Sequence, residues 1–115
     1  MSRRSRPNRP RPDRGPPVSR NQFVLDAEVL DIGPLRRTPA GVETVALRLR
    51  HFSSQNQGDG AMDAELTIDA SAFGPHAKPL SEVDKGQAIA VKGFLTKRSH
   101  ASDIPVFIIN EFKTP

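Results

Sequence analysis

The feature of this sequence that most constrains the fold is the alternation of side chains within residues 42–52, which is clearest from Leu47 to Arg50. Its apolar positions include Val45, Leu47 and Leu49. A period of two residues is typical of a β-strand with one buried face, because successive side chains point to opposite sides of a strand. The sequence therefore predicts a strand whose exposed face carries Arg48 and Arg50 and ends at the aromatic ring of Phe52.

A turn at residues 33–41 connects this strand to an earlier strand-like run at residues 21–32. The turn ends in Thr-Pro-Ala-Gly, a combination that favours turns, and Arg36 and Arg37 lie just before it. For any one arginine, the simpler interpretation is the solvated face of a sheet. Four arginines around one hairpin, with Phe52 at its end, instead favour a surface that contacts phosphates and stacks a base.

Three further strands are expected at residues 61–69, 86–98 and 104–112. Residues 53–60 are polar and rich in glycine, and we expect them to form a flexible loop. Prolines between the third and fourth strands leave room for a short helix near residues 81–85 or for irregular structure. This order predicts an all-β fold, the five-stranded oligonucleotide/oligosaccharide-binding barrel (OB-fold) with one short helical or irregular segment.

Gly93 interrupts the apolar positions of the fourth strand, and we expect a bend or bulge there. The hairpin that follows has its tip at residues 99–103, with Lys97, Arg98 and His100 at its base. The polar face of the third strand carries Asp63, Glu65 and Asp69. We expect that acidic face to bind phosphate poorly.

The chain divides into two parts of different composition. Residues 1–20 contain seven Arg, five Pro and a single acidic residue, whereas residues 21–115 contain ten Lys or Arg and twelve Asp or Glu. The net charges are therefore +6 and −2. We expect residues 1–20 to be a disordered tail and residues 21–115 to be the OB-fold domain, because the first segment has too little apolar surface to bury. The tail either holds phosphates non-specifically or is dispensable.

Several classes of protein are disfavoured by composition. Cysteine is absent, which removes disulfides and thiolate metal sites, and no apolar run has the length of a membrane span or a secretory signal. His51, His76 and His100 lack metal-ligand or catalytic spacing. We therefore expect no catalytic residues, no metal and no cofactor. A small hydrolase or nuclease is the weakest hypothesis, because no acid/base pair is visible.

Four segments carry a resemblance to a known family: residues 21–25, 34–41, 49–51 and 91–95. They resemble the bacterial primosomal replication protein N family, which is related to the bacterial single-stranded DNA-binding proteins. The resemblance covers about residues 21–113. It implies a cytoplasmic bacterial homodimer of OB-fold barrels that binds single-stranded DNA and works beside the restart helicase and other primosome proteins.

The expected DNA-binding residues come from both hairpins. They are Arg36, Arg37, Arg48, Arg50, Lys97, Arg98 and His100 for phosphates and Phe52 for base stacking. The family commonly stacks bases on aromatic residues including Trp, but this chain has no Trp or Tyr, which leaves Phe52 and Phe94. We therefore expect DNA binding that is weaker or more dependent on the tail than the resemblance implies. The alternative is an OB-fold adaptor that mainly binds protein, which the −2 charge of residues 21–115 favours.

Overall fold

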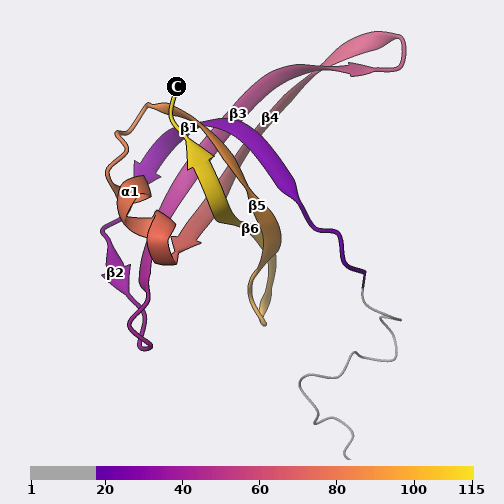
Figure 1. The fold of residues 1–115 in the computed structure, drawn as a ribbon. Coiled ribbons are helices and arrows are strands. Elements are labelled where there is room, and N and C mark those ends of the chain that lie inside the picture. The colour runs from indigo at the N-terminus through magenta and orange to yellow at the C-terminus, as the bar shows by residue number, and fades with distance from the viewer. Residues whose placement is uncertain (1–17) are drawn as a thin grey trace, which may run out of the picture.

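The computed structural model describes residues 18–115, so most of the expected tail lies outside the described residues. Five long strands form the barrel: β1 (Phe23–Ile32), β3 (Glu43–Gln57), β4 (Gly60–Phe73), β5 (Ala88–Ser99) and β6 (Ser102–Lys113). They close in the order β1-β3-β4-β6-β5 and back to β1, as Figure 1 shows. The neighbouring strands run antiparallel except for the parallel pair β4 and β6. The predicted all-β OB-fold barrel is confirmed.

Strand β1 closes the barrel because its two halves have different partners. Phe23 to Glu28 pair with β5, and Glu28 to Ile32 pair with β3. The pairing with β3 is irregular between Val29 and Asp31, which is the kind of bulge that bends and twists a strand. One strand can therefore turn from one side of the barrel to the other.

The core confirms the alternation expected along β3. Val45, Leu47 and Leu49 are buried, and Arg48 and Arg50 are exposed. In the same core, the Phe107 ring is fully buried and packs edge-on against Phe23, with 4.8 Å between the ring centroids. Burial of these aliphatic and aromatic side chains is the main driving force for closing the barrel.

Residues 53–60 do not form the flexible loop that we expected. Strands β3 and β4 continue through this segment and pair up to Gln57 and Gly60, leaving a two-residue turn at Gly58 and Asp59. Gly58 has a φ of +62° and no non-glycine residue in the described chain has a positive φ, as in a type II′ hairpin turn. The result is a long hairpin that extends beyond the barrel (Figure 1).

A chain of side-chain hydrogen bonds lies at the root of this hairpin. Nδ1 of His51 is 2.7 Å from the carbonyl oxygen of Asp26 on β1, and Nε2 is 2.6 Å from Oγ of Ser53. A carbonyl oxygen only accepts, so Nδ1 donates this hydrogen bond. Gln55 Nε2 donates to the same Oγ at 2.8 Å. These bonds connect the hairpin to β1 just beyond the point where backbone pairing between β1 and β3 begins, at Glu28.

The expected helix lies earlier in the chain than residues 81–85. A 3₁₀ turn, η2 (Gly74–His76), leads into a single helical turn, α1 (Ala77–Ser81), which lies at one end of the barrel (Figure 1). Pro79 does not break this helix, because amide groups in the first turn have no intrahelical acceptor to lose. Ala77 and Leu80 are fully buried, so burial places the helix here. Neither described helix is long and apolar enough to cross a membrane.

Candidate nucleic-acid interface

The outer face of β3 carries a row of side chains suited to a nucleic acid. Arg48, Arg50 and Phe52 all point away from the core, as the alternation predicted. The side chains of Arg48 and Arg50 are 57% and 47% exposed, and Phe52 is 65% exposed. Guanidinium groups beside an exposed ring are the combination that binds phosphates and stacks bases.

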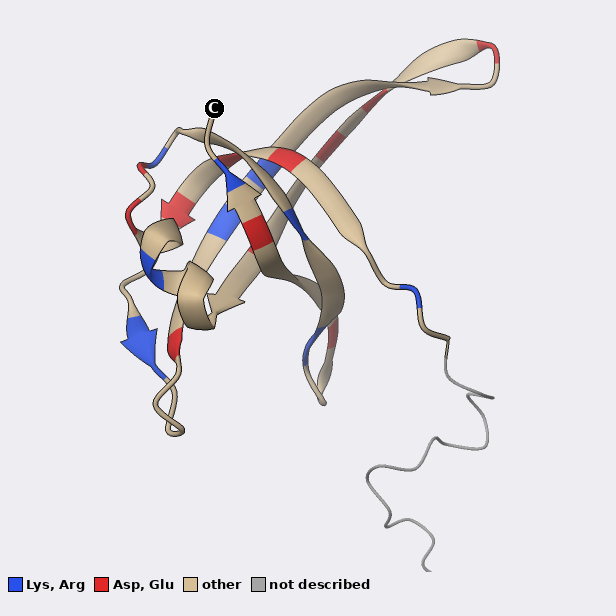
Figure 2. Ribbon diagram, in the orientation of Figure 1, with Lys and Arg blue, Asp and Glu red and all other residues tan. Residues whose placement is uncertain are grey.

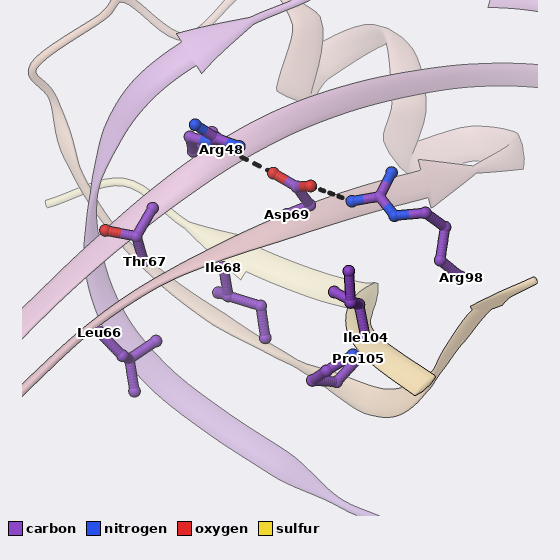
Figure 3. Close-up of a pocket in the computed structure, with 8 residues that line it drawn as sticks. All are labelled: Arg48, Leu66, Thr67, Ile68, Asp69, Arg98, Ile104 and Pro105. Atoms are coloured by element: carbon purple, nitrogen blue, oxygen red, sulfur yellow. Dashed lines mark hydrogen bonds and ion pairs between the residues drawn. The ribbon is translucent and has the colours of Figure 1, made fainter. Parts of the chain in front are cut away.

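Asp69 on β4 lies in the middle of this basic face. It is paired directly with Arg48 across the strands, and Nε of Arg48 donates a hydrogen bond of 3.1 Å to its Oδ1. Nη2 of Arg98, on β5, donates to the other oxygen, Oδ2 (Figure 3). We call these three residues the Arg48–Asp69–Arg98 cluster. The hydrogen bond from Arg48, assisted by Arg98 and opposed by partial burial, holds the pKa of the Asp69 carboxyl below its ordinary value.

Arg98 reaches β4 from the hairpin between β5 and β6. The pairing of these strands is irregular between Lys97 and Ser99, which is the position of Arg98. Bulges commonly redirect a side chain in this way. The two-residue turn at His100 and Ala101 follows, which confirms the hairpin tip expected at residues 99–103.

Two hollows adjoin the cluster. The first has a volume of about 450 Å³ and lies between β4 and the start of β6; its apolar lining is Leu66, Ile68, Ile104 and Pro105 (Figure 3). The second, of about 380 Å³, lies over Ala46, Ser71 and Val106. Arg48, Asp69 and Arg98 line both hollows. A ligand that filled both would therefore contact the cluster.

Arg50 has a separate acidic partner. Its Nη2 donates a hydrogen bond of 2.8 Å to Oε1 of Glu28 on β1. This bond and the charge of Glu28 raise the pKa of the Arg50 guanidinium further above its ordinary value. An arginine side chain is charged at every physiological pH even without this shift.

Arg36 and Arg37 form β2 (Arg36–Arg37), a two-residue strand beside β3. Arg37 is held near its own turn, 3.7 Å from a carboxylate oxygen of Glu43 and 3.3 Å from the carbonyl oxygen of Gly41. Arg36 pairs with Thr44, four residues before Arg48 on β3. At the rise of a strand this separation is about 13 Å, so Arg36 extends the basic face along β3.

Lys97 and His100 lie towards the tip of the β5–β6 hairpin and are exposed. Within residues 18–115, neither makes an ion pair. The structure thus brings Arg48, Arg50, Phe52 and Arg98 to one face, with β2 at its end and these two residues on the neighbouring hairpin. In the same part of the chain, no three potential metal-ligating side chains gather.

Charge is distributed unevenly between barrel and hairpin. The protruding β3–β4 hairpin carries Asp59, Asp63 and Glu65, and no Lys or Arg occurs between residues 51 and 77. Figure 2 shows this acidic hairpin beside basic segments on the barrel. Phosphate binding is therefore favoured on the barrel and opposed along the hairpin.

The sequence did not reveal that Asp69 faces Arg48. From the sequence, the acidic strand and the basic strand are expected to present separate faces, whereas their pairing places them side by side. The missed signal is the Gly58-Asp59 turn, because a two-residue turn fixes which residues are opposite each other. Arg48 is ten residues before Gly58 and Asp69 is ten residues after Asp59.

Comparison with known proteins assigns the chain and its fold to a family. The family described as another single-strand binding protein family matches residues 21–111. A replication restart protein PriB of Bordetella pertussis is 39% identical over 75 residues, which cover 65% of this chain and 70% of the relative. The chain belongs to the PriB family of single-strand binding proteins.

Other PriB proteins match over more of the chain. The protein of Nitrosomonas europaea is 27% identical over 94 residues, covering 82% of this chain and 87% of the relative. A PriB structure from Ralstonia solanacearum superposes with a TM-score of 0.76 at 28% identity and covers 84% and 98% of the two chains. A small single-stranded DNA-binding protein of Streptomyces coelicolor, 14% identical with a TM-score of 0.68, covers 85% and 94% and shares the fold. The family expected from the sequence is confirmed.

Proposed function

We propose that this protein binds single-stranded DNA without sequence preference, as a non-enzymatic accessory protein of replication restart. The observation that carries the proposal is the row of Arg48, Arg50 and Phe52 on the outer face of β3, beside two open hollows. Phosphates and base faces are common to all sequences, so such a surface does not discriminate between them. The relatives' name, replication restart protein PriB, supports the cellular process.

The ion pairs on this face do not prevent phosphate binding. The arginine side chains that make them are 47% to 69% exposed. Exposed ion pairs typically contribute about 0–1 kcal/mol, so a phosphate can displace a carboxylate at small cost. Each phosphate that an arginine neutralises releases cations from the DNA, which makes binding weaker at high salt.

The proposal extends to partners and to the tail. We propose that the protein acts as a homodimer in the bacterial cytoplasm, beside the restart helicase and other primosome proteins. We also propose that residues 1–20 form an arm that adds non-specific affinity for any polyanion, since this segment carries a charge of +6. In this proposal the barrel, and not the arm, provides the preference for single-stranded over double-stranded DNA.

A second candidate function is an adaptor that mainly binds protein. The β3–β4 hairpin favours it, because the hairpin is acidic and exposes Phe52 and Met62, which are 65% and 58% accessible. A partner that docked on these side chains would gain apolar contact with a weak dependence on salt. DNA binding on the barrel would instead fall steeply with salt.

Fluorescence titration of labelled oligothymidine tests the proposed function. The full chain and a variant that begins at Asn21 should both bind the single strand at low salt, and both should bind less tightly when salt is raised. The shorter variant should lose affinity for single and double strands alike while keeping its preference for single strands. If the shorter variant loses that preference, the barrel is not the part that recognises single-stranded DNA, and the adaptor function is the better explanation.

A further inference from the structure

Asp69 occupies an unusual position among the acidic residues. Among residues 18–115 it is the carboxylate that makes ion pairs with two arginines, Arg48 and Arg98. Both arginines were expected to bind phosphate, and they come from different strands, β3 and β5. Each oxygen of the carboxylate accepts from one guanidinium group. Two of the cations on this face are thus already paired within the protein.

The cluster also lies where a bound strand would pass. It forms a shared wall of the two hollows, with the apolar lining of Ile68 and Ile104 on one side and Ala46 and Val106 on the other. Figure 3 shows the carboxylate of Asp69 directly between the two guanidinium groups. A phosphate at this point would compete with Asp69 for the same donors, because both are oxygen anions that accept from guanidinium N–H groups.

We propose that Asp69 sets the affinity of this face for single-stranded DNA by holding Arg48 and Arg98 until a backbone phosphate displaces it. This inference rests on the proposed DNA-binding function. With Asp69 charged, the cluster carries a net charge of +1, and without that charge it carries +2. The native cluster therefore neutralises less phosphate than its two arginines could, and it releases fewer cations from the DNA.

The charge of Asp69 can be removed with little change of shape in Asp69→Asn. The matched control is Asp63→Asn, because Asp63 lies six residues earlier on the same side of β4 and makes no ion pair among the described residues. Both variants lose one negative charge from β4, so they change the net charge of the protein equally. If Asp69→Asn folds poorly, Asp69→Thr removes the same charge with a side chain that suits a strand.

Labelled oligothymidine is titrated with the full chain of each variant over a range of salt concentrations. We expect Asp69→Asn to bind about three- to tenfold more tightly than Asp63→Asn at low salt, because two exposed ion pairs no longer compete. Its plot of log K against log salt should be steeper by about 0.7, the slope for one more neutralised phosphate on a single strand. In a background that also carries Arg48→Ala and Arg98→Ala, Asp69→Asn should give no gain.

The other outcomes overturn the inference in distinguishable ways. Equal binding by Asp69→Asn and Asp63→Asn would mean that only net charge matters. Weaker binding by Asp69→Asn would mean that the carboxylate orients the guanidinium groups for DNA. Binding by the wild type without a gain in Asp69→Asn would overturn this inference and leave the proposed function standing. Absence of binding by the wild type and all variants would overturn both.

Discussion

At the scale of single residues, substitution of Arg48 and Arg50 tests whether the outer face of β3 binds DNA. We expect Arg48→Ala combined with Arg50→Ala to weaken single-strand binding and to flatten its dependence on salt. The slope of log K against log salt should fall by about 0.7 for each phosphate contact that is lost. Fluorescence titration of oligothymidine at several salt concentrations measures both effects.

Lys92→Ala combined with Lys113→Ala is the matched control. The two substitutions remove two positive charges, as the arginine substitutions do, but from β5 and β6. Both lysines are exposed, and Lys92 lies away from the Arg48–Asp69–Arg98 cluster because it is six residues from Arg98 along β5. The control should keep most of the salt slope. A folded Arg48/Arg50 double variant with the wild-type slope would mean that this face does not contact DNA.

The carboxylate of Asp69 gives a second residue-scale prediction, on stability. Its pKa is lowered in the folded protein, first by the hydrogen bond from Arg48. A group with a lowered folded pKa stabilises the fold above its unfolded pKa of about 3.9, and this contribution is lost as the pH falls through the folded pKa. Asp69→Asn should therefore cost up to about 1 kcal/mol per exposed pair at pH 7 and progressively less below pH ~4.

Urea denaturation of wild type and Asp69→Asn at pH 7 and at pH 3 measures this difference, with Asp63→Asn as the control for loss of a charge on β4. A stability difference that is equal at the two pH values would contradict the prediction.

At the scale of elements, Gly93 permits β5 to approach β6. A Cβ atom at this position would lie 1.8 Å from the carbonyl oxygen of Ile108 and 3.0 Å from the Phe107 ring. The nearest atom belongs to the backbone of the neighbouring strand and cannot move aside alone. We expect Gly93→Ala to destabilise the barrel by at least about 1–3 kcal/mol, the usual cost of overpacking, as measured by urea denaturation.

Gly60→Ala is the control, because nothing lies within 4 Å of its added Cβ and its φ is not positive. Its stability should stay close to that of the wild type. The pairing of β5 with β6 is irregular between Lys92 and Gly93. Equal stability of the two variants would show that the strands can separate at this bulge without cost.

Most strands of the barrel were predictable because each has one buried face. The segment from Ser53 to Gln57 was not, since its side chains are polar on both faces and no core lies beneath it. Its strand structure comes from backbone pairing with β4, which side-chain patterns do not report.

The bulge at Gly93 was predictable, because a glycine interrupting an apolar strand signals a close approach of backbones.

The sequence was enough to predict individual residues of the candidate site, but not the contacts between residues on different strands. Alternation along β3 was enough to place Arg48 and Arg50 together on the outer face. The contact of Arg98 with Asp69 depends on how the β5–β6 hairpin lies over the barrel, and that geometry is set by pairings between distant segments. Local sequence contains no information about such a contact.

At the scale of the whole molecule, assembly remains a prediction. Leu25 and Val29 of the aliphatic first strand belong to the core of the barrel, whereas Val24 is 64% exposed and Leu30 is half-buried. We expect a two-fold homodimer, in which one patch meets its own copy. Light scattering at micromolar concentration should give twice the chain mass of 12.6 kDa. The mass of a single chain at every accessible concentration would contradict it.

The way the long hairpin is attached has a consequence for the lifetime of its structure. Among the described residues, the two strands beyond the barrel pair only with each other, and at the root of the hairpin His51 bridges to Asp26 of β1. Opening this arm exposes almost no apolar core, so it can fray and re-form many times while the barrel stays closed. We therefore expect the barrel to unfold as one cooperative unit, whereas the paired hairpin opens and closes locally without it. A partner that binds the hairpin would then select among its open and closed forms.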